Sequence, residues 1–202
     1  MVEADGLEYT QARSDTEIRV LCVDGGQRVG RATLHLGSVE VATRIHGYQR
    51  RDVRSREIIA NEKLSLPEQQ LTTRAFWYVI DADLIDELTA AGFDAPGTLH
   101  AAEHAAIGML PLFTICDRWD VGGVSTARHA DTNGATIFIY DGSPGGAGIA
   151  ELGWEAAAEH LRATLEVVEA CGCVEGCPSC VQSPKCGSGN EPLDKDGSVD
   201  LI

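Results

Sequence analysis

Five of the seven cysteines in this 202-residue chain lie between residues 171 and 186, and this cluster constrains the fold more than any other feature. Cys177-Pro-Ser-Cys180 is a C-x-x-C knuckle, a tight turn that points two thiolates at one ion. Cys171 and Cys173 precede it, and Cys186 is a fifth candidate for four places. Four thiolates fill the tetrahedral shell of Zn²⁺. The spacing therefore predicts one structural zinc per chain that stabilises the fold and carries out no chemistry.

A disulfide staple and an iron–sulfur cluster are the alternatives to zinc. The first residues lack the basic and apolar regions of a secretory signal, and no apolar run is long enough to span a bilayer. We therefore expect a cytoplasmic protein, in which clustered thiols stay reduced and more often bind metal. The spacing alone does not separate zinc from an iron–sulfur cluster. Cys22 and Cys116 stand apart in apolar stretches, which predicts two buried thiols.

Charge is distributed unevenly along the chain. The formal net charge of −15 argues against a surface that binds nucleic acid throughout, because phosphate binding depends on Lys and Arg. Residues 44–56, however, hold five arginines against one aspartate. Arginine pairs with phosphates and aromatic rings stack on bases, so a local contact with single-stranded DNA is one interpretation, and a solvated hairpin is the other. The candidate nucleic-acid-binding residues are Arg44, Tyr48, Arg50, Arg51 and Arg54.

The hydrophobic pattern predicts an α+β fold. Strands are expected at 17–23, 29–36, 39–45, 56–60, 72–80 and 136–140, and helices at 82–91, 98–110 and 149–170. Because strands and helices are segregated, we expect an N-terminal antiparallel sheet packed with helices, followed by a Cys-rich, zinc-stapled segment. Residues 1–170 would form the α+β domain, and residues 171–202 a zinc-binding tail integral to it.

One helical motif has two interpretations. His100-Ala-Ala-Glu103-His104 matches H-x-x-E-H, the inverted zinc-protease motif, with both histidines one turn apart. In a zinc hydrolase, Glu103 would activate a metal-bound water. That site needs a third ligand, which the sequence does not single out. The apolar residues that follow favour the other interpretation, in which these are satisfied polar groups of a buried helix.

Residues 141–148 form a glycine-rich turn between a predicted strand and a predicted helix. Such a turn can hold a phosphate on free backbone N–H groups at the start of the helix. No Gly-Lys-Ser/Thr follows, and the G-x-G-x-x-G order is missing. A tight packing turn is therefore the favoured interpretation.

Three stretches together carry a family resemblance. They are residues 99–113 with 116–126, residues 138–151, and the segment from Cys171 to Lys195, which contains Gly-Cys-Pro-Ser-Cys-Val-Gln-Ser-Pro-Lys-Cys-Gly. Together they resemble the C-terminal zinc-binding domain of MrfA-type and Hrq-type superfamily 2 DNA helicases, which are related to SftH. The resemblance covers most of the chain from about residue 44, and its cysteine segment is the most specific part.

The resemblance implies ligands and a function. In this family the full protein is an ATP-driven 3′-to-5′ DNA translocase and helicase linked to DNA repair, and cysteines hold a structural zinc. The family order C-x-C-x3-C-x2-C falls on four cysteines here, with Cys186 as the alternative fourth ligand: Cys171, Cys173, Cys177 and Cys180. The H-x-x-E-H helix belongs to the scaffold of the domain in such proteins.

One departure from the family is large. The sequence has no G-x-x-x-x-G-K-[ST] motif, no DExH motif and no arginine-finger segment. We expect ATP and Mg²⁺ to act only in motor domains that this chain lacks, and no catalysis from the chain alone. The resemblance implies an accessory domain that positions the motor lobes of a parent chain and guides single-stranded DNA through weak, local contacts. The expected location is the cytoplasm, in association with the nucleoid.

Overall fold

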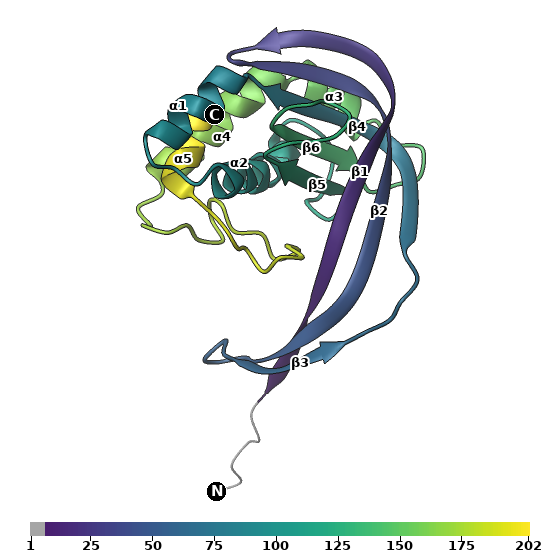
Figure 1. The fold of residues 1–202 in the computed structure, drawn as a ribbon, viewed down its shortest axis with the longest axis vertical. Coiled ribbons are helices and arrows are strands. Elements are labelled where there is room, and N and C mark those ends of the chain that lie inside the picture. The colour runs from purple at the N-terminus through teal and green to yellow at the C-terminus, as the bar shows by residue number, and fades with distance from the viewer. Residues whose placement is uncertain (1–6) are drawn as a thin grey trace, which may run out of the picture.

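The computed structural model describes residues 7–202, which form a strongly curved antiparallel sheet with helices packed against it (Figure 1). The strands are β1 (Glu8–Val29), β2 (Ala32–Asp52), β3 (Ile58–Lys63), β4 (Gln69–Ile80), β5 (Val121–Thr126) and β6 (Thr136–Asp141). The helices are α1 (Ala82–Ala90), α2 (Ala95–Met109), the 3₁₀ turn η1 (Leu110–Leu112), α3 (Ile149–Glu155), α4 (Ala157–Ala170) and α5 (Lys195–Leu201). The expected α+β class is confirmed.

The strand order is β1-β2-β4-β6-β5, with β3 paired to the far end of β2. Every paired strand in this part of the chain is antiparallel. No helix among residues 7–202 is both long and apolar enough to cross a membrane.

The long hairpin of β1 and β2 differs from the prediction of several shorter strands. Segments 29–36 and 39–45 were expected to be separate, but both lie mainly in β2, which runs through Gly37 without a break. A Cβ added to Gly37 would lie 2.0 Å from the carbonyl oxygen of Cys22, next to a shift in the β1–β2 register. The glycine therefore permits a close backbone approach at a bulge and does not end the strand.

The far end of this hairpin forms an arm, defined here as residues 8–13, 47–52 and 58–63. It extends well beyond the helices (Figure 1). Most of its side chains are exposed or half-buried, and backbone ladders from β1 to β2 and from β2 to β3 hold it together. The three strands of the arm are therefore exposed to solvent, and the arm has no hydrophobic core of its own.

Both faces of the central sheet are buried. On one face, Leu34 and Phe76 pack with the apolar side of α2. On the other, Trp77 and Phe138 pack against Ile18 of β1, because the long strand curls back over the sheet. A hydrogen-bond contact of 2.9 Å from His129 Nε2 to the Ile18 carbonyl oxygen fixes this curl. The curl brings β1 close to the segment that follows β5.

Two helix ends explain how the C-terminal segment docks. Asp94 caps α2 by accepting from the Gly97 amide, and Asp194 caps α5 by accepting from the Gly197 amide, each at 2.9 Å. The Asp194 carboxylate also accepts from the Asp94 amide at 2.9 Å, so the two caps are joined. Neither α5 nor β5 was predicted, and the expected helix 149–170 is divided into α3 and α4 at Ala156.

Candidate metal centre and nucleic-acid surface

The four-thiol cluster, Cys171, Cys173, Cys177 and Cys180, begins where α4 ends. Its sulfur atoms all lie within 4.8 Å of one another. Four of the Sγ–Sγ distances are 3.5–3.7 Å, whereas a disulfide bond measures about 2.05 Å. Four sulfurs at about 2.3 Å from one tetrahedral zinc ion would be roughly 3.8 Å apart. The spacing therefore fits one ion at the centre.

The same compactness separates zinc from an iron–sulfur cluster. The thiolates of such a cluster bind different iron atoms, so their sulfurs are spread around a larger inorganic core. Here all four sulfurs converge on one point, and the donor set is entirely thiolate. Mononuclear zinc in a closed shell is the species that this arrangement suits best.

The knuckle, residues 177–180, is held by its own backbone. The Cys177 amide donates to Cys180 Sγ at 3.2 Å, and the Cys180 amide donates to the Cys177 carbonyl oxygen at 3.0 Å. Gly176 precedes the knuckle with φ of +96°, and a Cβ there would lie 2.4 Å from Val181 Cγ2. The turn thus requires glycine both for its backbone conformation and for space.

The thiols of the knuckle differ in acidity. A hydrogen bond from the backbone of Ser179, aided by the Cys171 thiol, lowers the pKa of Cys177 to about 7. Burial raises the pKa of Cys180 to about 12. Without a metal ion Cys180 therefore stays protonated at neutral pH, whereas a bound Zn²⁺ deprotonates its thiol ligands.

Lys195, the first residue of α5, connects the four-thiol cluster to this helix. Its buried ammonium donates to the carbonyl oxygens of Cys171 and Cys173 at 2.6 and 2.7 Å. A zinc ion with four thiolates carries a net charge of −2, so a buried cation beside it offsets part of that charge. Lys195 therefore both orients the ligand backbone and balances the centre, as supporting groups around metal sites commonly do.

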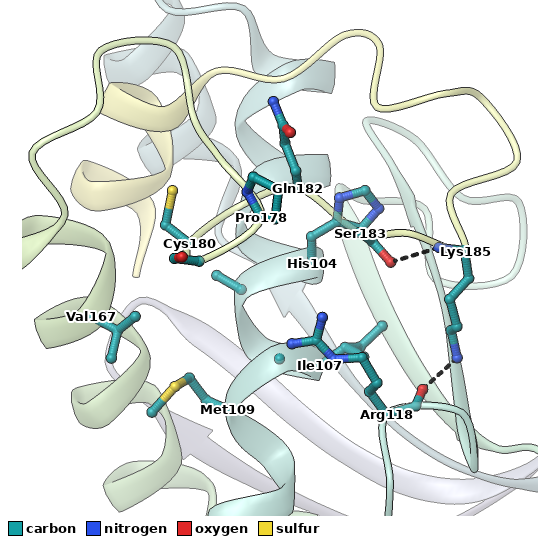
Figure 2. Close-up of a pocket in the computed structure, with 13 residues that line it drawn as sticks. His104, Ile107, Met109, Arg118, Val167, Pro178, Cys180, Gln182, Ser183 and Lys185 are labelled. Carbon is teal, nitrogen blue, oxygen red and sulfur yellow. Dashed lines mark hydrogen bonds between the residues drawn. The ribbon is translucent and has the colours of Figure 1, made fainter. Parts of the chain in front are cut away.

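A second lysine fixes the loop that follows the knuckle. Figure 2 shows the loop crossing α2 near His104, with Lys185 reaching the Arg118 carbonyl oxygen at 2.5 Å. The Lys185 ammonium also donates to the Val121 carbonyl and lies 5.6 Å from the centre of the Trp119 ring. Burial lowers the pKa of Lys185. This anchor holds the loop against the segment that leads into β5.

The fifth cysteine of the segment, Cys186, is grouped with other residues. Its Sγ lies 3.4 Å from His100 Nε2, and it forms a second compact group with His100 and His104. Burial opposes ionisation of Cys186, but hydrogen bonds from His100 and His104 outweigh it and lower the thiol pKa to about 4. Glu103 lies outside this ligand group, and burial raises its pKa.

The lone thiols outside both clusters match their prediction only in part. Cys22, expected to be buried, is exposed, and its sulfur donates to Asp24 at 3.2 Å. It lies in β1 beside a shift in the pairing with β2, which leaves its side chain in solvent. Cys116 is half-buried and packs at the edge of the core.

The arginines proposed for nucleic acid are spread along β2 and the turn after it. Arg44 pairs with Glu68 at 2.9 Å, and Arg50 pairs with Glu8 at 2.6 Å. Such exposed ion pairs contribute little to stability, so a phosphate could displace them. Arg51 donates to the Gln49 side chain at 2.7 Å. Tyr48 is half-buried within the arm, on β2 between β1 and β3.

Arg54 lies in the exposed turn after β2 and forms no ion pair within residues 7–202. Arg50, Arg51 and Arg54 therefore lie near one another in sequence at the end of the arm, while Arg44 lies closer to the body of the domain.

A carboxylate of the chain itself occupies the glycine-rich turn. The buried Asp141 carboxylate accepts from the backbone amides of Ala147, Ile149 and Ala150, the latter two at 3.2 and 2.8 Å. These are the N–H groups that a phosphate would need at the start of α3. The packing-turn interpretation is therefore confirmed, and Asp141 is its internal cap.

Comparisons with known proteins agree with the metal centre. The family model of the MrfA Zn-binding domain matches residues 102–181. A segment of 107 residues, 52% of this chain, is 45% identical to an uncharacterized protein of Methanocaldococcus jannaschii and makes up 96% of that protein.

Longer relatives are helicases. The chain is 33% identical over 176 residues, 86% of its length, to the uncharacterized ATP-dependent helicase YprA of Bacillus subtilis, and covers 23% of it. It is 25% identical over 188 residues to the ATP-dependent helicase hrq1 of Schizosaccharomyces pombe, covering 18% of that protein. A crystal structure of the DUF1998 helicase MrfA bound to DNA matches 98% of this chain with a TM-score of 0.65 and 28% identity, over 26% of that chain.

These matches define the class of protein as a zinc-binding domain built on an α+β scaffold. The chain belongs to the family of MrfA zinc-binding domains, which occur in MrfA-type and Hrq-type helicases, and the resemblance seen in the sequence is confirmed. It spans only about a quarter of YprA and of the MrfA chain.

Proposed function

We propose that this chain is the zinc-stapled accessory domain of an ATP-dependent 3′-to-5′ DNA helicase that acts in DNA repair. Cys171, Cys173, Cys177 and Cys180 would hold the zinc. The proposal is carried by the convergence of these four sulfurs on one point. They do so in a chain of which 98% matches part of the structure of a helicase bound to DNA. The motor lobes, with ATP and Mg²⁺, would lie outside this chain.

The zinc would act as a structural staple. A closed four-thiolate shell leaves no position for water or substrate, so the ion supplies folding energy and no reaction step. Lys195 and the joined caps of α2 and α5 connect the cluster to the helical face of the sheet. The domain would then present fixed surfaces to its neighbours.

Exposed apolar side chains support a contact with motor lobes. Leu112, Ile115 and Trp119 are exposed on the segment that runs from the end of η1 to β5, with Ile115 fully so. Grouped exposed apolar residues are typical of surfaces that another domain covers. We assign this segment to the motor lobes of a parent chain, in which the domain would hold the lobes in position.

For the DNA contact we assign the arm. The net charge of −15 would repel DNA from most of the surface, so binding would be weak and confined to Arg50 and Arg51 of the arm and Arg54 in the turn between β2 and β3. Aromatic stacking by Tyr48 would add to it only if the strands part slightly, because this ring is half-buried. The cytoplasm, with the nucleoid, is the corresponding location.

The experiment is a binding titration of fluorescent single-stranded DNA at several salt concentrations. Replacing Arg50, Arg51 and Arg54 together by alanine should weaken binding roughly tenfold and lower the slope against log salt by about 2, since each phosphate contact on a single strand contributes about 0.7.

The matched control removes the same charge elsewhere. Arg19, Arg28 and Arg31 are exposed arginines in ion pairs away from the arm. Their triple alanine variant should bind nearly as well as the wild type. If both variants lose affinity equally, the effect belongs to net charge and the assignment to the arm is wrong.

A further inference from the structure

The His–Cys cluster, His100, His104 and Cys186, lies outside the four-thiol cluster. The two histidines sit one turn apart on α2 with ring centroids 4.2 Å apart, and Cys186 comes from the loop after the knuckle. The nearest approach is 3.4 Å from Cys186 Sγ to His100 Nε2, and one ligand atom from each residue lies within 4.8 Å of the others. Three donors from two distant segments therefore converge on one point.

The outer nitrogens of both rings are fixed by backbone carbonyls. His100 Nδ1 lies 2.8 Å from the Pro192 carbonyl oxygen, and His104 Nδ1 lies 2.9 Å from that of Val181. A carbonyl oxygen only accepts, so each Nδ1 carries a proton and each Nε2 is left for the cluster. Histidines that bind metal are typically oriented in this way.

The sulfur has two further polar contacts of a kind that suits a thiolate. The Asn190 amide donates to Cys186 Sγ at 3.2 Å, and Ser188 Oγ lies 3.1 Å from it. One protonated imidazole is enough to pair with this thiolate, so an ion pair alone does not account for two histidines that both place a ring nitrogen near the sulfur. A shared cation satisfies both Nε2 atoms and the sulfur at once.

The cluster opens on a cavity of about 570 Å³ between α2, β5 and the loop around Cys186. Buried Glu103 and half-buried Tyr140 also line this cavity. Three protein ligands facing a cavity differ from the four-thiol cluster, which supplies all four positions itself. This is the arrangement in which zinc keeps one exchangeable position.

We propose that His100 Nε2, His104 Nε2 and Cys186 Sγ bind a second zinc ion, with water or a small anion from the cavity as the fourth ligand. Two imidazoles and one thiolate suit zinc, whereas Mg²⁺ and Ca²⁺ require oxygen ligands. The ion would join α2 to the loop that carries the knuckle, and its binding does not depend on the proposed role in a helicase.

The test is the zinc content of the full chain, measured by inductively coupled plasma mass spectrometry against amino-acid analysis. We expect two zinc ions per wild-type chain and one in Cys186→Ala, with two retained in the control Cys116→Ala. One zinc in both the wild type and Cys186→Ala would overturn the second site and leave the proposed function intact. No zinc in the wild type would overturn both.

A cobalt titration of the metal-free chain gives an independent readout. Two equivalents of Co²⁺ should bind, and the thiolate-to-cobalt absorption from the second should be about a quarter of that from the first, because one thiolate stands against four. His100→Gln, which keeps a polar side chain on α2, should bind only the first equivalent. A wild type that saturates at one equivalent contradicts the proposal even if Cys186→Ala does not fold.

Discussion

The two ligand clusters of this domain differ in how they are built. The four-thiol cluster comes from ten consecutive residues, closes its own shell and is supported by Lys195. The His–Cys cluster joins a helix to a loop about eighty residues away and faces a cavity. A closed, local cluster stabilises the fold, whereas an open cluster built from distant segments leaves room for an outside ligand.

The largest effect is expected from opening the closed cluster. Cys180→Ser should release the zinc and lower the free energy of unfolding by about 5 kcal/mol, because structural zinc binding is folding energy. Thermal unfolding followed by circular dichroism, with and without added zinc, measures this. The control Cys22→Ser changes an exposed thiol and should leave the thermal midpoint in place. If Cys180→Ser unfolds like the control, the closed cluster is not a staple.

A smaller effect should come from distorting the knuckle without removing a ligand. Gly176→Ala places a Cβ 2.4 Å from Val181 Cγ2 at a φ of +96°, so we expect a loss of about 3 kcal/mol and faster zinc release to a chelator. Gly172→Ala lies between two of the thiols with nothing within 4 Å of its added Cβ, and should be nearly neutral. Equal release rates in the two variants would mean that the knuckle geometry does not hold the ion.

The smallest effect concerns the support of the closed cluster. Lys195→Met keeps the buried stem but removes the donors to the carbonyls of Cys171 and Cys173, which should cost about 1–2 kcal/mol. Zinc content should stay unchanged while zinc affinity falls. Lys63→Met changes an exposed lysine in β3 and serves as the control. If Lys63→Met lowers the zinc affinity as much as Lys195→Met does, Lys195 has no specific role in supporting the cluster.

The sequence predicted best what is local. The knuckle spacing and the apolar helix 98–110 were visible because each depends on residues close together in the chain. The strand β5 was missed because Val121-Gly-Gly-Val has two glycines and little strand pattern. The length of β1 was missed for a related reason: its arm is polar on both faces and is held by backbone pairing, which leaves little trace in hydrophobicity.

The third member of the His–Cys cluster could have been found. The sequence left one thiol without a place in a four-ligand site, and the H-x-x-E-H motif left two histidines without a third ligand. Assigning the spare thiol as the missing third ligand would have placed Cys186 beside His100 and His104. Lys195 offers no such signal, because its acceptors are backbone carbonyls that any residue type supplies.

The most direct test of the central claim is zinc X-ray absorption spectroscopy on the Cys186→Ala variant, which isolates the closed cluster. We predict four sulfur neighbours at about 2.3 Å and no nitrogen or oxygen ligand. Fewer than four sulfurs around zinc, or iron in place of zinc in protein purified without oxygen, would contradict a zinc staple made by Cys171, Cys173, Cys177 and Cys180.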